Sequence, residues 1–180
     1  MAETRLEEPR NRPSGSKLKF SDFALPGPVV DLMAADGVTE PFPIQAKTLP
    51  DALAGHDILG RGRTGSGKTL GFVLPLVTRL SASRVKVKAK SPRSIILAPT
   101  RELANQIHAA LEPLAAEVGL RSTTVYGGVS AGPQISALRS GVDIVVACPG
   151  RLLDHHRSGH LSFDNVEITA IDEADHMADL

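Results

Sequence analysis

The chain has 180 residues, 42% hydrophobic and 22% charged, which is enough for one globular domain with a sizeable core. Its twenty basic and twenty acidic residues cancel, so net charge gives no indication of nucleic-acid binding. No apolar run approaches the ~18 residues of a membrane span, and MAETRLEEPR lacks the apolar stretch of a signal peptide. Cys148 is the single cysteine, which excludes an internal disulfide and favours a buried small hydrophobe. We therefore expect a cytoplasmic protein with no membrane partner.

Residues 1–17 are polar, contain Pro9, Pro13 and Gly15, and show no periodicity, so we expect a disordered tail before one domain over 18–180. Short apolar runs then alternate with helical patterns such as 101–119. The runs of strand length are 57–60 (DILG), 94–98 (SIILA), 122–126 (STTVY), 143–148 (DIVVAC) and 166–171 (VEITAI). Strands alternating with helices predict an α/β fold with a mainly parallel sheet covered by helices on both faces.

The charges are unevenly distributed along the chain. From Ile58 to Arg101 there is no acid, but ten of the twenty Lys and Arg residues lie there. From Ser158 to Leu180 there are six acids and no Lys or Arg. The basic stretch indicates an anion-binding region, although 84–93 (RVKVKAKSPR) is best interpreted as an exposed, solvated loop.

Three histidines, His155, His156 and His160, lie close together in the sequence. No cysteine or carboxylate completes a metal-ligand set with them, and Gly159 interrupts the helical spacing of the last two. We therefore predict solvated residues near a helix end rather than a metal site.

The run 62–69 (GRTGSGKT) follows the DILG segment and matches the phosphate-loop pattern GxxxxGKT. Gly62, Gly65 and Gly67 let successive backbone amides point inward, and the following helix adds its positive N-terminus, so the loop can hold phosphate oxygens. Lys68 is expected to contact the β and γ phosphates, and the Thr69 hydroxyl to bind Mg²⁺.

The same segment also satisfies the dinucleotide pattern GxGxxG through Gly60, Gly62 and Gly65. That fold needs an acid about 20 residues later for the ribose, and the acid-free stretch through Arg101 supplies none. NADP could use an arginine instead, but GKT after the glycines would then be a coincidence. We favour the mononucleotide loop over this alternative and over an inert glycine turn.

A second motif, which is acidic, is AIDEAD (170–175), at the end of the last predicted strand. Asp172 is expected at the C-terminal tip of that strand, where open parallel sheets bind ligands, and can hold Mg²⁺ directly or through water. Glu173 can orient or deprotonate an attacking water. The alternative is a solvated acidic turn that caps a helix, and the phosphate loop makes the functional interpretation preferable.

Together these motifs resemble those of the first core domain of DEAD-box ATP-dependent RNA helicases, a RecA-like P-loop domain. In the family's order the chain has GVTEPFPIQ (37–45), the phosphate loop, PTRELA (99–104), GG (127–128), PGR (149–151) and DEAD (172–175). The resemblance covers nearly all of 20–180. It implies an ATP-dependent RNA helicase that uses ATP and Mg²⁺, with Lys68, Asp172 and Glu173 as catalytic residues.

The resemblance also assigns the residues that bind ATP. Gln45 is similar to the family's adenine reader, and Phe20 to an aromatic that stacks on the base, with a core aromatic as the alternative and Phe23 as a competitor. Val38 and Phe42 depart from the usual adenine motif. The implied phosphate contacts are Arg63, Thr64, Gly65, Ser66, Gly67, Lys68 and Thr69.

A second set of residues matches positions that contact the RNA backbone, with little sequence specificity. These are Pro99, Thr100, Arg101, Gly128, Pro149, Gly150 and Arg151. Thr100 can cap the helix that follows it and so expose amides to phosphate. Cys148 stands where the family usually has Thr and donates a weaker hydrogen bond.

Family members have a second RecA-like domain, and a Ser-Ala-Thr strand between the phosphate-loop strand and the DEAD strand. Neither is in this sequence, so the predicted domain is incomplete. We expect the chain alone to lack unwinding activity and to fold poorly, because a gap in the sheet leaves two rows of backbone groups unpaired. The alternative is a standalone nucleotide-dependent RNA-binding module without turnover. A GTPase or kinase switch fits Gln45 and the ordered motifs less well.

Overall fold

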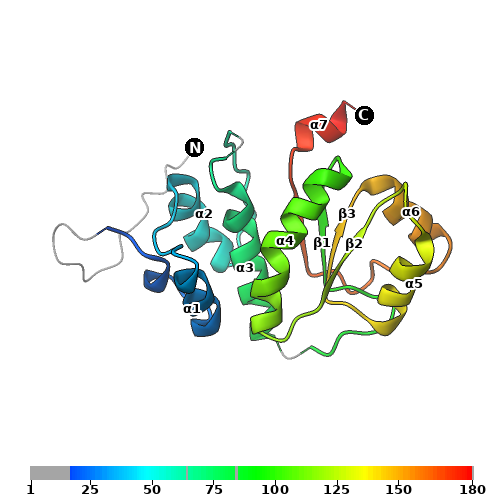
Figure 1. Cartoon of the computed structure of the whole chain (residues 1–180), viewed down its shortest axis with the longest axis horizontal. Coiled ribbons are helices and arrows are strands. Elements are labelled where there is room, and N and C mark those ends of the chain that lie inside the picture. Colours follow the sequence, from blue (N-terminus) through cyan, green and yellow to red (C-terminus); the bar gives the residue numbers. More distant parts are fainter. Residues whose placement is uncertain (1–16, 64, 84, 180) are drawn as a thin grey trace.

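The computed structural model describes residues 17–63, 65–83 and 85–179, so the predicted tail lies outside it except for residue 17. The structure is an α/β domain (Figure 1). In chain order its elements are η1 (Phe20–Asp22), α1 (Gly27–Ala35), α2 (Pro43–Leu53), α3 (Lys68–Ala82), β1 (Ser94–Leu97), α4 (Arg101–Glu117), β2 (Ser122–Val125), α5 (Ala131–Ser140), β3 (Ile144–Ala147), α6 (Pro149–Arg157), β4 (Ile168–Ile171) and α7 (Ala174–Ala178).

The four strands form one parallel sheet in the order β2-β3-β1-β4, which confirms the predicted fold class. Their registers coincide, because the last residues of β1, β3 and β4, namely Leu97, Ala147 and Ile171, are in line across the sheet. The loops that follow the strands therefore gather at one edge of the sheet, the edge formed by the C-terminal ends of the strands. This edge carries the predicted PTRELA, GG, PGR and DEAD segments.

Alternation of side chains along the strands gives each face of the sheet its own core. Ile96, Ile144 and Val146 point to one face and pack with apolar residues of α1, α3 and α4. Ile95 and Val145 point to the other face, where Leu138 of α5 and Leu152 of α6 cover them. Figure 1 shows this arrangement, with the sheet between α3 and α4 on one side and α5 and α6 on the other.

The predicted strand at 57–60 is wrong. This segment is irregular, and Leu59 is 89% exposed. Between it and the outer edge of β4 lies a cleft of about 640 Å³ that α3 also lines. Because a strand needs a neighbour to pair its backbone groups, an apolar run beside an open cleft does not become one.

This difference changes the basis of the expected poor folding. With 57–60 irregular, the described residues show no gap between two strands; the sheet has two edge strands, β2 and β4. A free edge is the ordinary condition of an outer strand, so the backbone cost is smaller than the sequence suggested. Poor folding itself stays a prediction, which thermal unfolding tests.

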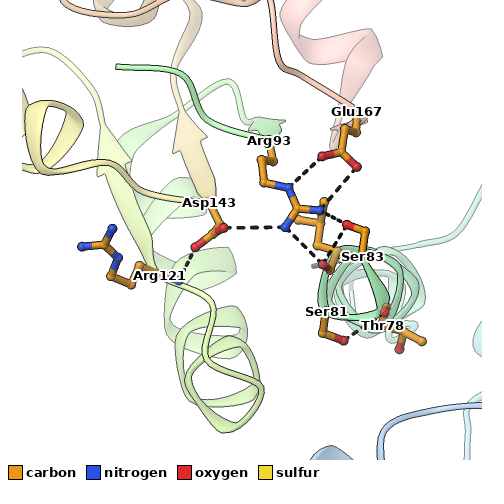
Figure 2. Close-up of polar contacts among 8 residues, drawn as sticks. Thr78, Ser81, Ser83, Arg93, Arg121, Asp143 and Glu167 are labelled. Carbon is orange, nitrogen blue, oxygen red and sulfur yellow. Dashed lines mark hydrogen bonds and ion pairs between the residues drawn. The ribbon is translucent and has the colours of Figure 1, made fainter. Parts of the chain in front are cut away.

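The basic stretch 84–93 is only partly the solvated loop that we predicted, because Arg93 is 2% exposed. Its Nε donates to Glu167 Oε1 at 2.7 Å, and its Nη1 donates to the Leu80 carbonyl at 3.1 Å. A further bond goes to the Ser83 hydroxyl, and Nη1 lies 3.7 Å from Asp143 Oδ1. Figure 2 shows the guanidinium between the two carboxylates. Arg93 thus joins α3 to the segments that lead into β1, β3 and β4.

Candidate nucleotide-binding and RNA-binding site

The phosphate loop leads into α3 through two glycines with positive φ, Gly65 at 80° and Gly67 at 84°. Gly67 is the N-cap of the helix, which begins at Lys68. A Cβ on Gly67 would lie 2.5 Å from Nε2 of Gln45, so both the backbone angle and the close approach require glycine here. The unsatisfied amides at the start of α3 are therefore at the loop, as phosphate binding requires.

The structure brings the phosphate loop and the acidic pair together. Nζ of Lys68 lies 3.7 Å from Oδ1 of Asp172, whose residue is 8% exposed. The Asp172 amide donates to the Leu97 carbonyl at 3.0 Å, which fixes the carboxylate at the tip of β4 beside β1. The Glu173 amide donates to Asp172 Oδ1 at 3.0 Å, and Glu173 has a left-handed backbone with φ of 51°.

The loop residues fit a triphosphate with a divalent cation. The Ser66 hydroxyl oxygen is buried and has no hydrogen-bond partner among the described residues, so a donor in the loop is available to a ligand. Thr69 lies in the first turn of α3, half-buried, while Arg63 is exposed. Thr64 lies outside the described residues. No group of three or more His, Cys, Asp or Glu residues that could hold a metal ion occurs in the described part of the chain.

The residues assigned to adenine differ in their positions. Gln45 lies next to the loop, but both of its polar atoms are already bonded: Nε2 donates to the Gly67 carbonyl at 2.8 Å, and Oε1 accepts from the Phe42 amide at 2.9 Å. Each atom keeps one further hydrogen-bonding position, but Gln45 is 1% exposed, so contact with a base requires the groups around it to open. Phe20 is 1% exposed and belongs to the core, which is the alternative that the sequence left open, and its stacking role stays a prediction.

The residues assigned to RNA lie in three loops at the same edge of the sheet. Thr100 follows β1, and its hydroxyl accepts from the Leu103 amide at 3.2 Å, so the predicted cap of α4 is confirmed. Pro149, Gly150 and Arg151 form the first turn of α6, after β3. Cys148 is the N-cap of that helix and makes no side-chain cap bond. Burial, and then the nearby Glu102 carboxylate, raise the pKa of the Cys148 thiol, so it stays neutral.

Tyr126 links these loops. Its hydroxyl donates to Asn105 Oδ1 of α4 at 2.9 Å, and the Arg101 guanidinium carbon lies 5.8 Å from the centre of its ring. Gly128, two residues later, has φ of 76°, and a Cβ there would lie 2.6 Å from Nη1 of Arg101. Nη1 of Arg151 donates to the Val129 carbonyl at 3.2 Å. The loops after β1, β2 and β3 are therefore in direct contact.

The sequence interpretation of the histidines is wrong for His155, which is 3% exposed. Its Nε2 lies 3.0 Å from Oε1 of Gln134, another buried polar residue that the sequence analysis missed. His156 is exposed as predicted. The sequence gives little indication of this pair, because His155 and Gln134 are 21 residues apart and lie on different helices.

A parallel sheet with a glycine loop at the start of a helix, and a lysine that faces an acid at the tip of β4, defines a P-loop nucleotide-binding domain. Residues 42–180 match the model of the DEAD/DEAH box helicase family. The chain belongs to this family, as its motifs predicted.

Similar proteins extend this result. Over 166 residues the chain is 43% identical to the ATP-dependent RNA helicase RhlB of Sodalis glossinidius (strain morsitans), covering 90% of this chain and 40% of the relative. It is 44% identical to DEAD-box ATP-dependent RNA helicase 30 of Arabidopsis thaliana, covering 96% of this chain and 29% of the relative. The crystal structure of the RNA helicase Prp28 from Chaetomium thermophilum bound to ADP superposes with a TM-score of 0.80 at 39% identity, covering 91% and 39% of the two chains. The chain thus spans less than half the length of these relatives. No described helix is long and apolar enough to cross a membrane.

Proposed function

We propose that the chain binds ATP with Mg²⁺ at the phosphate loop and the RNA backbone at the neighbouring loops, as the first core domain of an ATP-dependent RNA helicase. The observation that carries the proposal is the 3.7 Å approach of Lys68 Nζ to Asp172 Oδ1. The positive charge of Lys68 and the negative charge of Asp172 are far apart in sequence but close in space. A magnesium-bound triphosphate needs both, the positive charge for the phosphates and the carboxylate for the ion. The names of the relatives support the same activity.

In this proposal each residue of the phosphate site has one task. The amides of the loop and of the start of α3 bind phosphate oxygens, together with the side chains of Arg63, Thr64 and Ser66. Lys68 leaves Asp172 to neutralise the β and γ phosphates. Thr69 and Asp172 hold Mg²⁺, which supplies charge neutralisation and orientation of the phosphates. Glu173 orients the attacking water and accepts its proton.

The RNA site in this proposal uses the adjoining loops. The N-termini of α4 and α6 offer amides to phosphate, and Arg101 and Arg151 add charged donors. Pro99, Thr100, Gly128, Pro149 and Gly150 shape the surface. Since these groups contact the backbone, all RNA sequences bind with similar affinity. Unwinding, in this proposal, requires a second RecA-like domain, and the protein acts in the cytoplasm.

Titration of a fluorescent ATP analogue, with and without single-stranded RNA, tests the proposal. We expect Lys68→Ala to weaken analogue binding by at least about tenfold, because a charged contact to phosphate is lost. Lys86→Ala is the matched control, since this lysine is exposed in the 85–93 segment, and it should leave the affinity unchanged. Equal affinity in Lys68→Ala and the wild type would dismiss the role of the lysine.

Phosphate release separates the proposed function from the alternative, a nucleotide-dependent RNA-binding module without turnover. RNA binding that responds to the ATP analogue, together with ATP hydrolysis that Glu173→Gln abolishes, supports the helicase domain. RNA binding that responds to nucleotide with no hydrolysis by the wild type supports the alternative.

A further inference from the structure

A buried chain of hydrogen bonds lies behind the proposed RNA loops. Gln134 of α5 donates through Nε2 to the carbonyl of Tyr126 at 2.9 Å. Its Oε1 lies 3.0 Å from Nε2 of His155, on α6. Both side chains are buried, and these hydrogen bonds join them to each other and to Tyr126. The proposed mechanism uses neither of them.

The chemistry of the end group fixes the direction of every bond. A backbone carbonyl only accepts, so the amide nitrogen of Gln134 must face Tyr126 and the amide oxygen must face His155. His155 must then donate from Nε2. Burial, with help from the Arg151 and His160 charges, lowers the pKa of His155, so the ring is neutral and carries its proton on Nε2. The chain of bonds has one arrangement.

These bonds act on the segment 126–129, which contains Gly127 and Gly128. Helix α6 contacts this segment at two places. At Tyr126 the contact runs from His155 through Gln134, and at Val129 the carbonyl accepts from Arg151 at 3.2 Å. Tyr126 also holds the loop to α4 through its hydroxyl. The segment is therefore fixed between the helices whose N-termini the proposed RNA site uses.

We propose that Gln134 and His155 are positioning residues that set the distance between the Gly127–Gly128 loop and the N-terminus of α6, and so preorganise the RNA-backbone site. This inference rests on the proposed function. An RNA backbone has a fixed phosphate spacing, so donors on two loops bind it together only when their separation matches that spacing. Gln134 and His155 fix this separation without touching RNA.

The variant Gln134→Glu tests the inference, because it keeps the shape but replaces the donor with an acceptor that faces the Tyr126 carbonyl. We expect its Kd for single-stranded RNA to rise about tenfold, because the carbonyl of Tyr126 in the binding loop loses its buried donor. Its Kd for the ATP analogue should stay within about twofold of wild type, since additivity holds for distant sites. A merely structural role predicts lower thermal stability with unchanged RNA affinity of the folded protein.

The histidine offers a rescue test. His155→Leu removes the donor and should weaken RNA binding as much as Gln134→Glu, while His155→Gln keeps an N–H donor and should restore near-wild-type affinity. The double variant Gln134→Glu/His155→Leu should be no weaker than either single variant, because both break the same chain of bonds. Full additivity would overturn the inference.

Nitrogen NMR of the wild-type imidazole tests the arrangement itself and needs no variant to fold. A neutral ring protonated on Nε2 is expected, and a ring protonated on Nδ1 alone would overturn the inference. If the wild type binds no RNA at all, the proposed function fails. If the wild type binds RNA and folded Gln134→Glu binds it equally, only the inference fails.

Discussion

Replacement of Arg93 with methionine tests the structure at the residue where it differs most from the sequence-based prediction. The guanidinium is 2% exposed and bonds to Glu167, the Leu80 carbonyl and the Ser83 hydroxyl, with Asp143 at 3.7 Å. Removal of one member of a buried ion pair costs about 3–5 kcal/mol, because the partner charge stays buried without compensation. Methionine keeps most of the volume, so the loss measures charge and hydrogen bonding rather than a cavity.

The structure places the expected loss at the lower end of that range. The side chain of Glu167 is 39% exposed and can regain water once Arg93 is gone. Asp143 keeps one partner, because its Oδ2 still accepts from the Arg121 amide at 2.9 Å. We therefore expect Arg93→Met to lower the free energy of unfolding by about 3 kcal/mol.

Urea unfolding followed by circular dichroism measures this change, with linear extrapolation to water. Arg121→Met is the matched control: its side chain is exposed and makes one 3.3 Å bond to the Ser140 carbonyl, so the loss should be within about 0.5 kcal/mol. If Arg93→Met is as stable as the control, the side chain is solvated, as the sequence suggested, and the packing described around it is wrong.

Three further predictions concern the phosphate loop, the buried histidine and the expected poor folding. Gly67→Ala should weaken ATP-analogue binding by at least about tenfold, because it strains a positive φ and displaces Gln45. Gly60→Ala is the control, since a Cβ there meets open space and should leave the affinity unchanged. The dinucleotide alternative predicts that Gly60→Ala weakens binding. The pKa of His155 is lower in the folded protein than in the unfolded chain, so the free energy of unfolding should fall as pH drops through the ordinary pKa of 6.5. Urea unfolding at pH 7.5 and 5.5 measures this fall, and His155→Gln should make it smaller. Thermal unfolding of the monomer should be broad if the chain folds poorly, and a sharp cooperative transition would contradict that expectation.

The parallel sheet was predictable because its signals are local. Short apolar runs, each separated by a helical pattern, identify strands and crossovers without knowledge of their partners. The phosphate loop and Thr100 were predictable for the same reason, since a loop and a helix cap depend on residues a few positions apart.

The errors concern residues whose partners are distant. Arg93 was assigned to solvent because its basic neighbours are solvated, but its acceptor Glu167 is 74 positions away. The burial of His155 depends on its partner Gln134. Whether 57–60 forms a strand depends on a neighbouring strand, which the residues of the run do not specify. Phe20 is a different case, because an aromatic ring suits a base or a core, and the structure packs it in the core without testing the stacking role.

The central claim is that the phosphate loop and Asp172 share one magnesium-bound nucleotide, and the dependence of ATP-analogue affinity on Mg²⁺ tests it most directly. In the wild type and in Asp179→Asn, an exposed control on the same segment, Mg²⁺ should strengthen binding by at least about tenfold. In Asp172→Asn, affinity without Mg²⁺ should remain and most of the strengthening should disappear. Equal strengthening in Asp172→Asn and the wild type would contradict the claim.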